Sequence, residues 1–321
     1  MIKENTVLIL GAGASKPYGF PSATELRDEV IRVKDMVSTS PLINVGLEPG
    51  EYQRFANDLA QSGYESVDAF LEDRQEYVEI GKAAIALNLL RFERDSSLFP
   101  PKQPRDHWYE ILWHKMKAPT WATFKRNSLS VITFNYDRSL EHYLASVVRN
   151  NYGTRPPTAA KGLRSLPILH VHGILGEYAP PHFPLSKYPY GWGPNSHTLD
   201  IARRSIKIVH ENDAASPEFQ TAHQLIENAK RVLFVGFGYR ESNMKKLGLS
   251  PGQKGAHTSL QTKLVVGTHK GYRADQWARI CLRYEFPVMA ARSGSGSVSD
   301  FLSKWLFLIL VTRVKPSGLT S

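Results

Sequence analysis

A short apolar run that ends in glycine limits what this chain can fold into more than any other feature. Residues 6–10 read Thr-Val-Leu-Ile-Leu, and Gly11 follows directly. An uninterrupted apolar stretch of this length is typical of a strand covered on both faces of a parallel sheet. Helices must then pack on both faces of that sheet, so the run predicts an α/β fold.

Four later segments repeat this pattern, and stretches with helical periodicity separate them. We expect strands over residues 129–134, 167–172, 231–235 and 263–266. We expect helices from Ala23 to about Lys34, from about Arg138 to Val148, and from Pro217 to Lys230. Ser22 and Glu25 have the spacing of a capping box at the start of the first helix. Strands that alternate with helices predict a doubly wound parallel sheet with right-handed connections.

A long helical stretch interrupts this alternation after the first strand. From Glu51 to about Lys125 apolar residues recur every three or four positions, which predicts a helical module inserted at residues 45–125. Pro100, Pro101 and Pro104 divide this region in two. Residues 177–195 are rich in Pro, Gly, Tyr and Trp, so we expect a loop segment at 174–216 over the functional site. Residues 1–321 would then form a single domain.

The composition excludes several classes of protein. Cys281 is the single cysteine, so neither an internal disulfide nor a cysteine-based zinc site can form. This cysteine usage, and a start that does not resemble a signal peptide, predict a cytoplasmic protein. The longest apolar run, Trp305–Val311, has seven residues. A membrane-spanning helix needs roughly 20, so no membrane association is expected.

The chain also carries an excess of positive charge. Lys and Arg number 40 and Asp and Glu number 30, which gives a formal net charge of +10. A basic surface favours anionic partners such as nucleotides or nucleic acid. The charge is spread thinly along the chain, so a solvated surface without a special partner explains it equally well.

The first motif that carries chemistry is Gly11-Ala12-Gly13-Ala14-Ser15. Glycines let a backbone approach a pyrophosphate and expose amide donors to it. The dehydrogenase fingerprint has a third glycine at the sixth position, directly at the start of a helix. Here that position is Lys16, and the expected helix begins only at Ala23. The departure disfavours hydride transfer, and a plain turn at the strand end is the alternative interpretation.

The second motif, Thr133-Phe134-Asn135-Tyr136-Asp137, follows the second predicted strand. Ligands of open α/β sheets bind at the carboxyl ends of the strands. The amide of Asn135 could orient a ribose or a water there, and the Asp137 carboxylate could hold a carboxamide. Alternatively, both residues cap the helix that follows.

The third motif, His172-Gly173, ends the third predicted strand. A histidine at this place can act as a general base near neutral pH. His170 would share a strand face with His172, so a metal pair is conceivable. The sequence offers no evident third or fourth ligand, and we expect no metal. A satisfied, half-buried histidine is the alternative for either residue.

The fourth motif, Gly236-Phe237-Gly238-Tyr239, follows the fourth predicted strand. It supplies a second glycine turn on the same sheet edge, although a simple turn would look the same. The carboxyl ends of parallel strands meet at one edge, so the four motifs are expected to converge on one ligand site.

Taken together, the motifs resemble those of the SIR2 family, in its bacterial SIR2-like branch. The turn at 11–15 resembles the first NAD-binding motif, and Gly19-Phe20-Pro21 resembles the segment that follows it on the cofactor-covering loop. Residues 133–137 resemble the family's Thr-Gln-Asn-Ile-Asp, His172-Gly173 its catalytic His-Gly, and Gly236-Phe237-Gly238 its later glycine motif. Ser66-Val67-Asp68-Ala69-Phe70-Leu71 resembles a helical insert of prokaryotic members.

This resemblance implies a Rossmann-like parallel sheet of sirtuin type and NAD as the substrate. The catalytic residues implied are Asn135, Asp137 and His172. The NAD-binding residues implied are Gly11, Ala12, Gly13, Ser15, Pro21, Gly236, Phe237 and Gly238. One departure is decisive, because deacylating sirtuins carry a four-cysteine zinc module and this chain has one cysteine.

The resemblance without the zinc module therefore implies an NAD+ glycohydrolase that acts in bacterial anti-phage defence by depleting NAD. A sirtuin-like protein deacylase and a non-catalytic nucleotide-sensing module are the alternatives. No separate sensor domain remains in the chain, so control by another chain or by homo-oligomers is expected. Family members pair with HerA-type ATPases or short Argonautes, through which nucleic acid would enter only indirectly.

Overall fold

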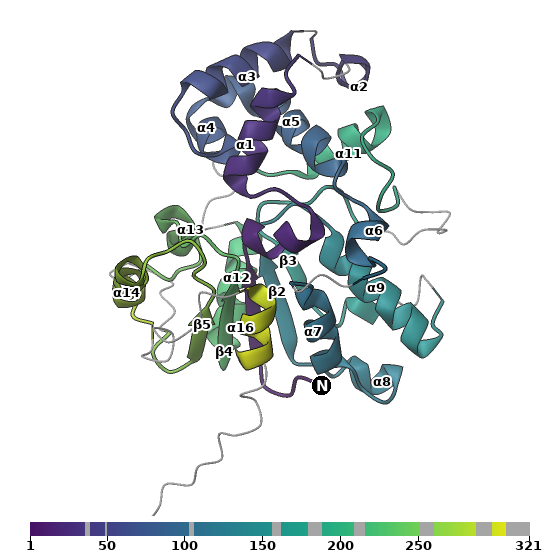
Figure 1. The fold of residues 1–321 in the computed structure, drawn as a ribbon, viewed down its shortest axis with the longest axis vertical. Coiled ribbons are helices and arrows are strands. Elements are labelled where there is room, and N and C mark those ends of the chain that lie inside the picture. The colour runs from purple at the N-terminus through teal and green to yellow at the C-terminus, as the bar shows by residue number, and fades with distance from the viewer. Residues whose placement is uncertain are drawn as a thin grey trace, which may run out of the picture.

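A five-stranded parallel sheet forms the centre of the fold in the computed structural model (Figure 1). The strands lie in the order β3-β2-β1-β4-β5. Their bounds are Thr6–Leu10 for β1, Leu129–Thr133 for β2, Ile168–His170 for β3, Arg231–Val235 for β4 and Leu264–Gly267 for β5. The order reverses between β1 and β4, which is where doubly wound sheets open a crevice for ligands.

The structure describes residues 1–35, 39–48, 50–102, 106–155, 162–178, 188–208, 216–250, 260–286 and 297–305. Pro104, one of the three prolines expected to divide the helical region, lies outside the described residues. Residues 306–311 of the apolar run that begins at Trp305 also lie outside them.

Strand β1 is buried along its whole length, and its two faces belong to different cores. Leu8 and Leu10 lie in a large core that includes residues of α7 (Trp108–Met116) and α9 (Ser139–Tyr152). Val7 and Ile9 lie in a smaller core with α12 (Pro217–Asn228) and α14 (Ala274–Arg283). This alternation confirms that the opening apolar run is a strand covered on both faces.

The chain between β1 and β2 is helical, as the periodicity predicted. The helices are α1 (Ala23–Arg32), α2 (Thr39–Ile43), α3 (Glu51–Gln61), α4 (Val67–Asp73), α5 (Val78–Leu90), α6 (Asp95–Leu98), α7 and α8 (Trp121–Phe124). Figure 1 shows α1, α3, α4 and α5 grouped beyond the carboxyl ends of the strands. Helix α5 is buried on nearly every side at the centre of this group, which we call the helical roof.

The ends of β2, β5, α1, α9 and α12 differ from the predicted ones by a few residues, and two larger differences concern β3 and the segment after it. Strand β3 ends at His170, so His172 lies in the following turn and not in the strand. The segment 174–216 is expected from its composition to be a loop, but it contains α11 (Ser196–Ser205), which packs against α5. The amphipathic spacing of Leu199 and Ala202, both buried, produces this helix. Helix α13 (Glu241–Lys246) follows β4 in the chain, and α16 (Val298–Trp305) follows α14.

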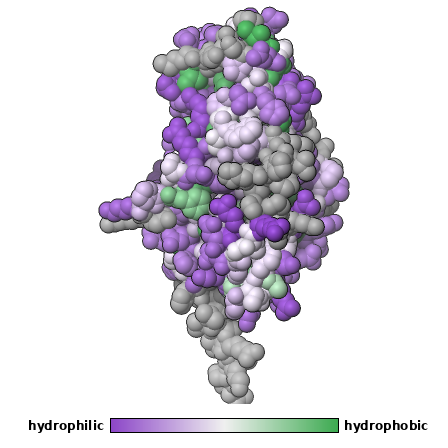
Figure 2. Space-filling model, turned by 90° about the vertical axis from the view of Figure 1, so that its right-hand side faces the viewer, coloured by the Kyte–Doolittle hydropathy of each residue, from purple (hydrophilic) through white to green (hydrophobic). Residues whose placement is uncertain are grey.

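The surface in Figure 2 is mostly hydrophilic, and apolar side chains form small separate patches on that face. Single exposed apolar residues are ordinary in folded proteins. Among the described helices, none is both long enough and apolar enough to cross a membrane.

Candidate functional site

A cavity of about 340 Å³ lies between the carboxyl ends of the strands and the helical roof. Every residue that the sequence singled out as catalytic or NAD-binding lines it: Gly11, Ala12, Gly13, Ser15, Pro21, Asn135, Asp137, His172, Gly236, Phe237 and Gly238. The loops after β1, β2, β3 and β4 therefore meet at one place, as parallel strands require. None of the described residues in 174–216 lines this cavity. Residues 179–187 and 209–215 of this segment, which we expected over the site, lie outside the described residues.

The two glycine turns contact each other through their backbones. The N–H groups of Gly11 and Gly13 donate to the carbonyl oxygens of Val235 and Gly236, both at 3.0 Å. A Cβ atom on Gly11 would lie 2.6 Å from the Gly236 oxygen, and one on Gly236 would lie 2.0 Å from the Ala14 nitrogen. Gly236 also has φ of +58°. These glycines are required by the contact between the turns, whatever ligand the turns hold.

This contact corrects one expectation about the first turn. The amides of Gly11, Gly13, Ala14 and Ser15 all donate to backbone carbonyls, so they are not exposed to a ligand. Within the turn, the Ala12 amide is the one without a partner among the described residues. The beginning of α1, at Ala23 and Thr24, also lines the cavity and carries helix N-terminal amides. An anion in the cavity would find donors there as well.

A directed chain of hydrogen bonds joins the first and second motifs. The Asn135 side-chain nitrogen donates to the Gly11 carbonyl at 3.0 Å and to Ser15 Oγ at 2.9 Å. A carbonyl can only accept, so this contact fixes which end of the Asn135 amide is nitrogen. Ser15 Oγ in turn donates to Asp137 Oδ2 at 2.7 Å. The Asn135 amide hydrogens are thus committed to the protein, and its carbonyl oxygen is left for a ligand.

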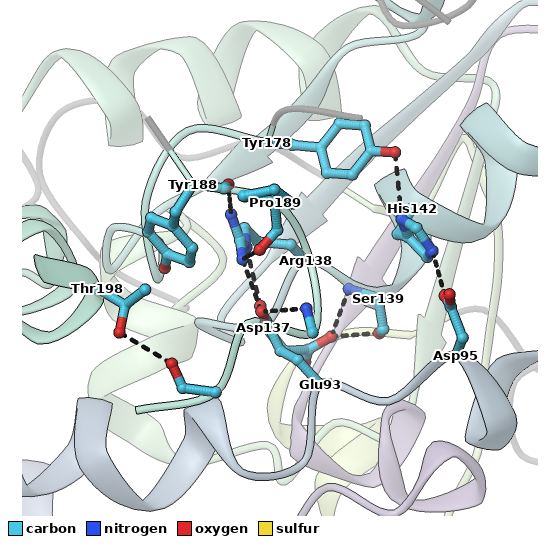
Figure 3. Close-up of polar contacts among 12 residues, drawn as sticks. Glu93, Asp95, Asp137, Arg138, Ser139, His142, Tyr178, Tyr188, Pro189 and Thr198 are labelled. Atoms are coloured by element: carbon cyan, nitrogen blue, oxygen red, sulfur yellow. Dashed lines mark hydrogen bonds and ion pairs between the residues drawn. The ribbon is translucent and has the colours of Figure 1, made fainter. Parts of the chain in front are cut away.

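Asp137 is buried at the base of this chain, beside the cavity. Its Oδ1 accepts hydrogen bonds from the backbone N–H and the side-chain hydroxyl of Ser139, the first residue of α9 (Figure 3). Burial raises the pKa of the Asp137 carboxyl, and the hydrogen bonds from Ser139 and Ser15 oppose this shift. The alternative that Asp137 supports the start of the helix is therefore correct, and it coexists with the contact to Ser15. Asn135 makes no such contact with the helix.

His172 is buried beside the cavity without a polar contact at Nε2. Its side chain lines the cavity, the residue is 6% exposed, and Nε2 has no hydrogen-bond partner among the described residues. The ring packs edge-on against Phe134, with centroids 5.1 Å apart. Burial lowers the pKa of His172 to about 4, and the nearby negative charge of Asp68 opposes that shift. The imidazole is therefore neutral at neutral pH and can accept a hydrogen bond.

His170 is not a partner of His172 in a metal site. Its Nδ1 contacts the backbone carbonyl oxygen of Asn135 at 2.8 Å, and its Nε2 contacts Glu141 Oε1 at 2.6 Å. Both ring nitrogens are thus committed, and the interpretation as a satisfied histidine holds for His170. Among the residues that the structure describes, no three His, Cys, Asp or Glu side chains are grouped so that they could hold a metal.

The sequence motifs missed the residues that close the cavity from above. Ser66, Asp68 and Glu72 come from the helical roof, and Arg240 comes from the loop after β4. Arg240 Nη1 donates to Ser66 Oγ at 3.1 Å, and the Tyr136 hydroxyl donates to Asp68 Oδ1. Ser66 and Asp68 fall in the segment that resembles a helical insert of prokaryotic SIR2-like proteins. Nothing in the linear spacing brings that segment to the sheet edge.

Comparisons with known proteins assign no family to this chain. No protein-family model and no curated protein matches the chain.

Proposed function

We propose that this protein hydrolyses NAD+ to nicotinamide and ADP-ribose. The observation that carries the proposal is the single cavity lined by all eleven residues that the sequence motifs single out. Residues as far apart in the chain as Gly11 and Gly238 line this one concave site. Concave sites of this kind are the usual places where proteins bind ligands.

The chemistry follows from the groups left unsatisfied in that cavity. Hydrolysis breaks the bond between ribose C1′ and the nicotinamide nitrogen, whose electron pair leaves with nicotinamide. The Asn135 carbonyl oxygen can accept a hydrogen bond from a ribose hydroxyl or from the attacking water. His172 is neutral and can accept a hydrogen bond from a second hydroxyl. Positioning of this kind lowers a barrier by several kcal/mol.

We assign Asp137 a different task from the one that the sequence motif implies. Both of its oxygens already accept hydrogen bonds from serines. It therefore positions Ser15 and, through Ser15, the Asn135 amide, and does not need to hold the nicotinamide carboxamide. Oδ1 accepts two hydrogen bonds and Oδ2 accepts one, so most of the roughly four acceptor sites of the carboxylate are already used.

The biological setting that we propose rests on the resemblance of the motifs to the bacterial SIR2-like branch. Depletion of NAD would make the protein an effector of anti-phage defence. Its control would come from assembly into homo-oligomers or from a partner such as a HerA-type ATPase or a short Argonaute.

Two substitutions test the proposed reaction. We expect His172→Ala and Asn135→Ala to abolish nicotinamide release, measured by chromatography, while circular dichroism shows an intact fold. His114→Ala and Asn151→Ala are matched controls, because both residues lie outside the core and neither lines the cavity. Release at the wild-type rate by both cavity variants would exclude the assignment.

The same assay separates the other interpretations. A deacylase consumes NAD only when an acyl-lysine peptide is added, whereas a hydrolase does not need the peptide. A nucleotide sensor binds NAD and releases no nicotinamide under any condition.

A further inference from the structure

Helix α4 supplies a carboxylate to the upper wall of the cavity. Asp68 and Glu72 lie one turn apart on α4, and both line the cavity. Neither belongs to the strand-end motifs, because both come from the helical roof. The cavity thus combines groups from two parts of the chain that are distant in sequence.

Asp68 is held in a fixed position over the sheet edge. The Tyr136 hydroxyl, from the loop after β2, donates to Asp68 Oδ1. Ser66 begins α4 by accepting from the Ala69 N–H at 3.2 Å, and its hydroxyl also accepts from Arg240 after β4. The start of α4 is therefore tied to two strand ends, which is how a reactive group is kept in place.

Asp68 forms no ion pair with a Lys or Arg side chain among the described residues. Arg240 lines the same cavity, but its guanidinium donates to the Ser66 hydroxyl. His172 is buried beside the cavity with Nε2 free of a hydrogen bond among the described residues, and its neutral ring supplies no positive charge. The negative charge of Asp68 is nonetheless felt at His172. A carboxylate without a counter-charge in such a place suits a ligand that becomes positive.

We propose that Asp68 stabilises the positive charge that develops on the ribose when the bond to nicotinamide breaks. This inference rests on the proposed NAD+ hydrolysis. As the C1′–N bond breaks, the electron pair neutralises the nicotinamide ring, and positive charge moves to C1′ and the ring oxygen of the ribose. Water then bonds to C1′ through its oxygen, and its proton passes to Asp68 and on to solvent. Carboxylates beside the anomeric carbon serve glycoside hydrolysis in the same way.

The test compares Asp68→Asn with Asp73→Asn in the full chain. The asparagine keeps the shape of the side chain and an oxygen for the Tyr136 hydroxyl, and it removes the charge. We expect kcat of Asp68→Asn to fall by about 10²–10³-fold, as when a group acting mainly on the transition state is removed. The Kd for NAD, measured by calorimetry, should change by less than about 3-fold. Asp73→Asn should keep kcat within about 3-fold, because Asp73 also lies on α4 and accepts a hydrogen bond from a tyrosine, Tyr64, but does not line the cavity.

A second variant separates charge from position. Tyr136→Phe leaves the carboxylate and removes the hydroxyl that holds it, so we expect a smaller fall in kcat, of about 10-fold. Added azide or formate should restore activity to Asp68→Ala, which leaves both the space and the charge of the carboxylate vacant, and should leave Tyr136→Phe unchanged.

Three outcomes would overturn the proposal. Wild-type kcat in Asp68→Asn excludes a role for its charge. Equal losses in Asp68→Asn and Asp73→Asn, with weaker NAD binding in both, indicate that α4 only shapes the cavity. Both outcomes leave the proposed function standing, provided that His172→Ala is inactive. If the wild-type chain binds NAD and releases no nicotinamide, the proposed function fails first and the role of Asp68 falls with it.

Discussion

Two buried polar networks begin at neighbouring residues after β2, and they differ in what they leave unsatisfied (Figure 3). Asp137 accepts hydrogen bonds from uncharged donors on Ser15 and Ser139, beside the cavity. Arg138, which is fully buried, makes a two-pronged ion pair with Glu93 at 2.8 and 2.6 Å. We call these the open network and the closed network.

In the closed network every guanidinium nitrogen of Arg138 donates a hydrogen bond. The Arg138 guanidinium also contacts the Tyr188 carbonyl at 3.3 Å and lies 4.1 Å from the centre of the Tyr188 ring. Glu93 accepts a further hydrogen bond from the Gly191 amide. These contacts fasten residues 188–191 to the protein. The open network instead leaves the Asn135 side-chain oxygen and, close to it, Nε2 of His172 without a hydrogen-bond partner among the described residues. The comparison teaches that burial of polar groups alone does not mark a functional site, because Asn135 and His172 line the cavity and the residues of the closed network do not.

The largest expected effect comes from breaking the closed network. We expect Arg138→Met to lower the free energy of unfolding by about 3–5 kcal/mol, because the Glu93 carboxylate is left buried without a counter-charge. Urea denaturation measures this loss. The double variant with Glu93→Gln should recover a large part of it, and Arg149→Met, away from the core on α9, should cost less than about 0.5 kcal/mol. A loss below about 1 kcal/mol for Arg138→Met would contradict the distinction between the networks.

The second-largest expected effect is the pH dependence of stability that the protonation of His172 causes. Its pKa is about 4 in the folded protein against 6.5 as the usual value, so the unfolded chain binds more protons between these pH values. The free energy of unfolding should therefore fall as the pH falls from about 6.5 to 4, by about 3 kcal/mol in total. His172→Gln should remove this part of the pH dependence. Denaturation curves for both proteins at several pH values test it, and parallel pH profiles would count against a buried neutral ring.

The smallest effect is expected at Asp137, where the sign is opposite. Burial raises its pKa, so the folded protein binds the extra proton and the stability contribution of Asp137 declines as the pH rises. Asp137→Asn should cost less than about 2 kcal/mol, and it should cost less at about pH 7.5 than at about pH 4.5. Thermal unfolding at the two pH values measures the difference. The same variant should lower NAD hydrolysis through the displaced Ser15, which an unchanged rate would contradict.

Local pattern was sufficient for the strands and for the residues at their ends. The apolar runs at Thr6–Leu10 and Arg231–Val235 match β1 and β4 residue for residue, because a strand buried on both faces needs apolar side chains at nearly every position. The capping box of Ser22 and Glu25 is present at the start of α1. The carboxyl ends of parallel strands share one edge, so the amino-acid pattern alone was enough to group Asn135, His172 and Gly236.

Local pattern failed where a side chain's state depends on distant residues. His170 and His172 lie two residues apart in the same predicted strand. Glu141 hydrogen-bonds Nε2 of His170, whereas no described residue bonds Nε2 of His172. The length of β3 was overestimated because pairing with β2 covers only Ile168–His170. The helix α11 was missed for a different reason: its local signals, the Asn195 cap and the spacing of Leu199 and Ala202, lie in a segment whose Pro, Gly, Tyr and Trp content favours a loop.

The sequence by itself determined the elements of this protein, their parallel sheet and the strand-end residues of its cavity, because hydrophobic period and turn chemistry act over a few neighbouring positions. The tertiary structure alone decided which polar groups stay unsatisfied and what covers them. Three features depend on residues from distant parts of the chain: the hydrogen-bonded amides of the first glycine turn, the neutral His172 and the position of the Asp68 carboxylate. Burial and hydrogen bonding between distant residues give no signal in the spacing of neighbouring residues.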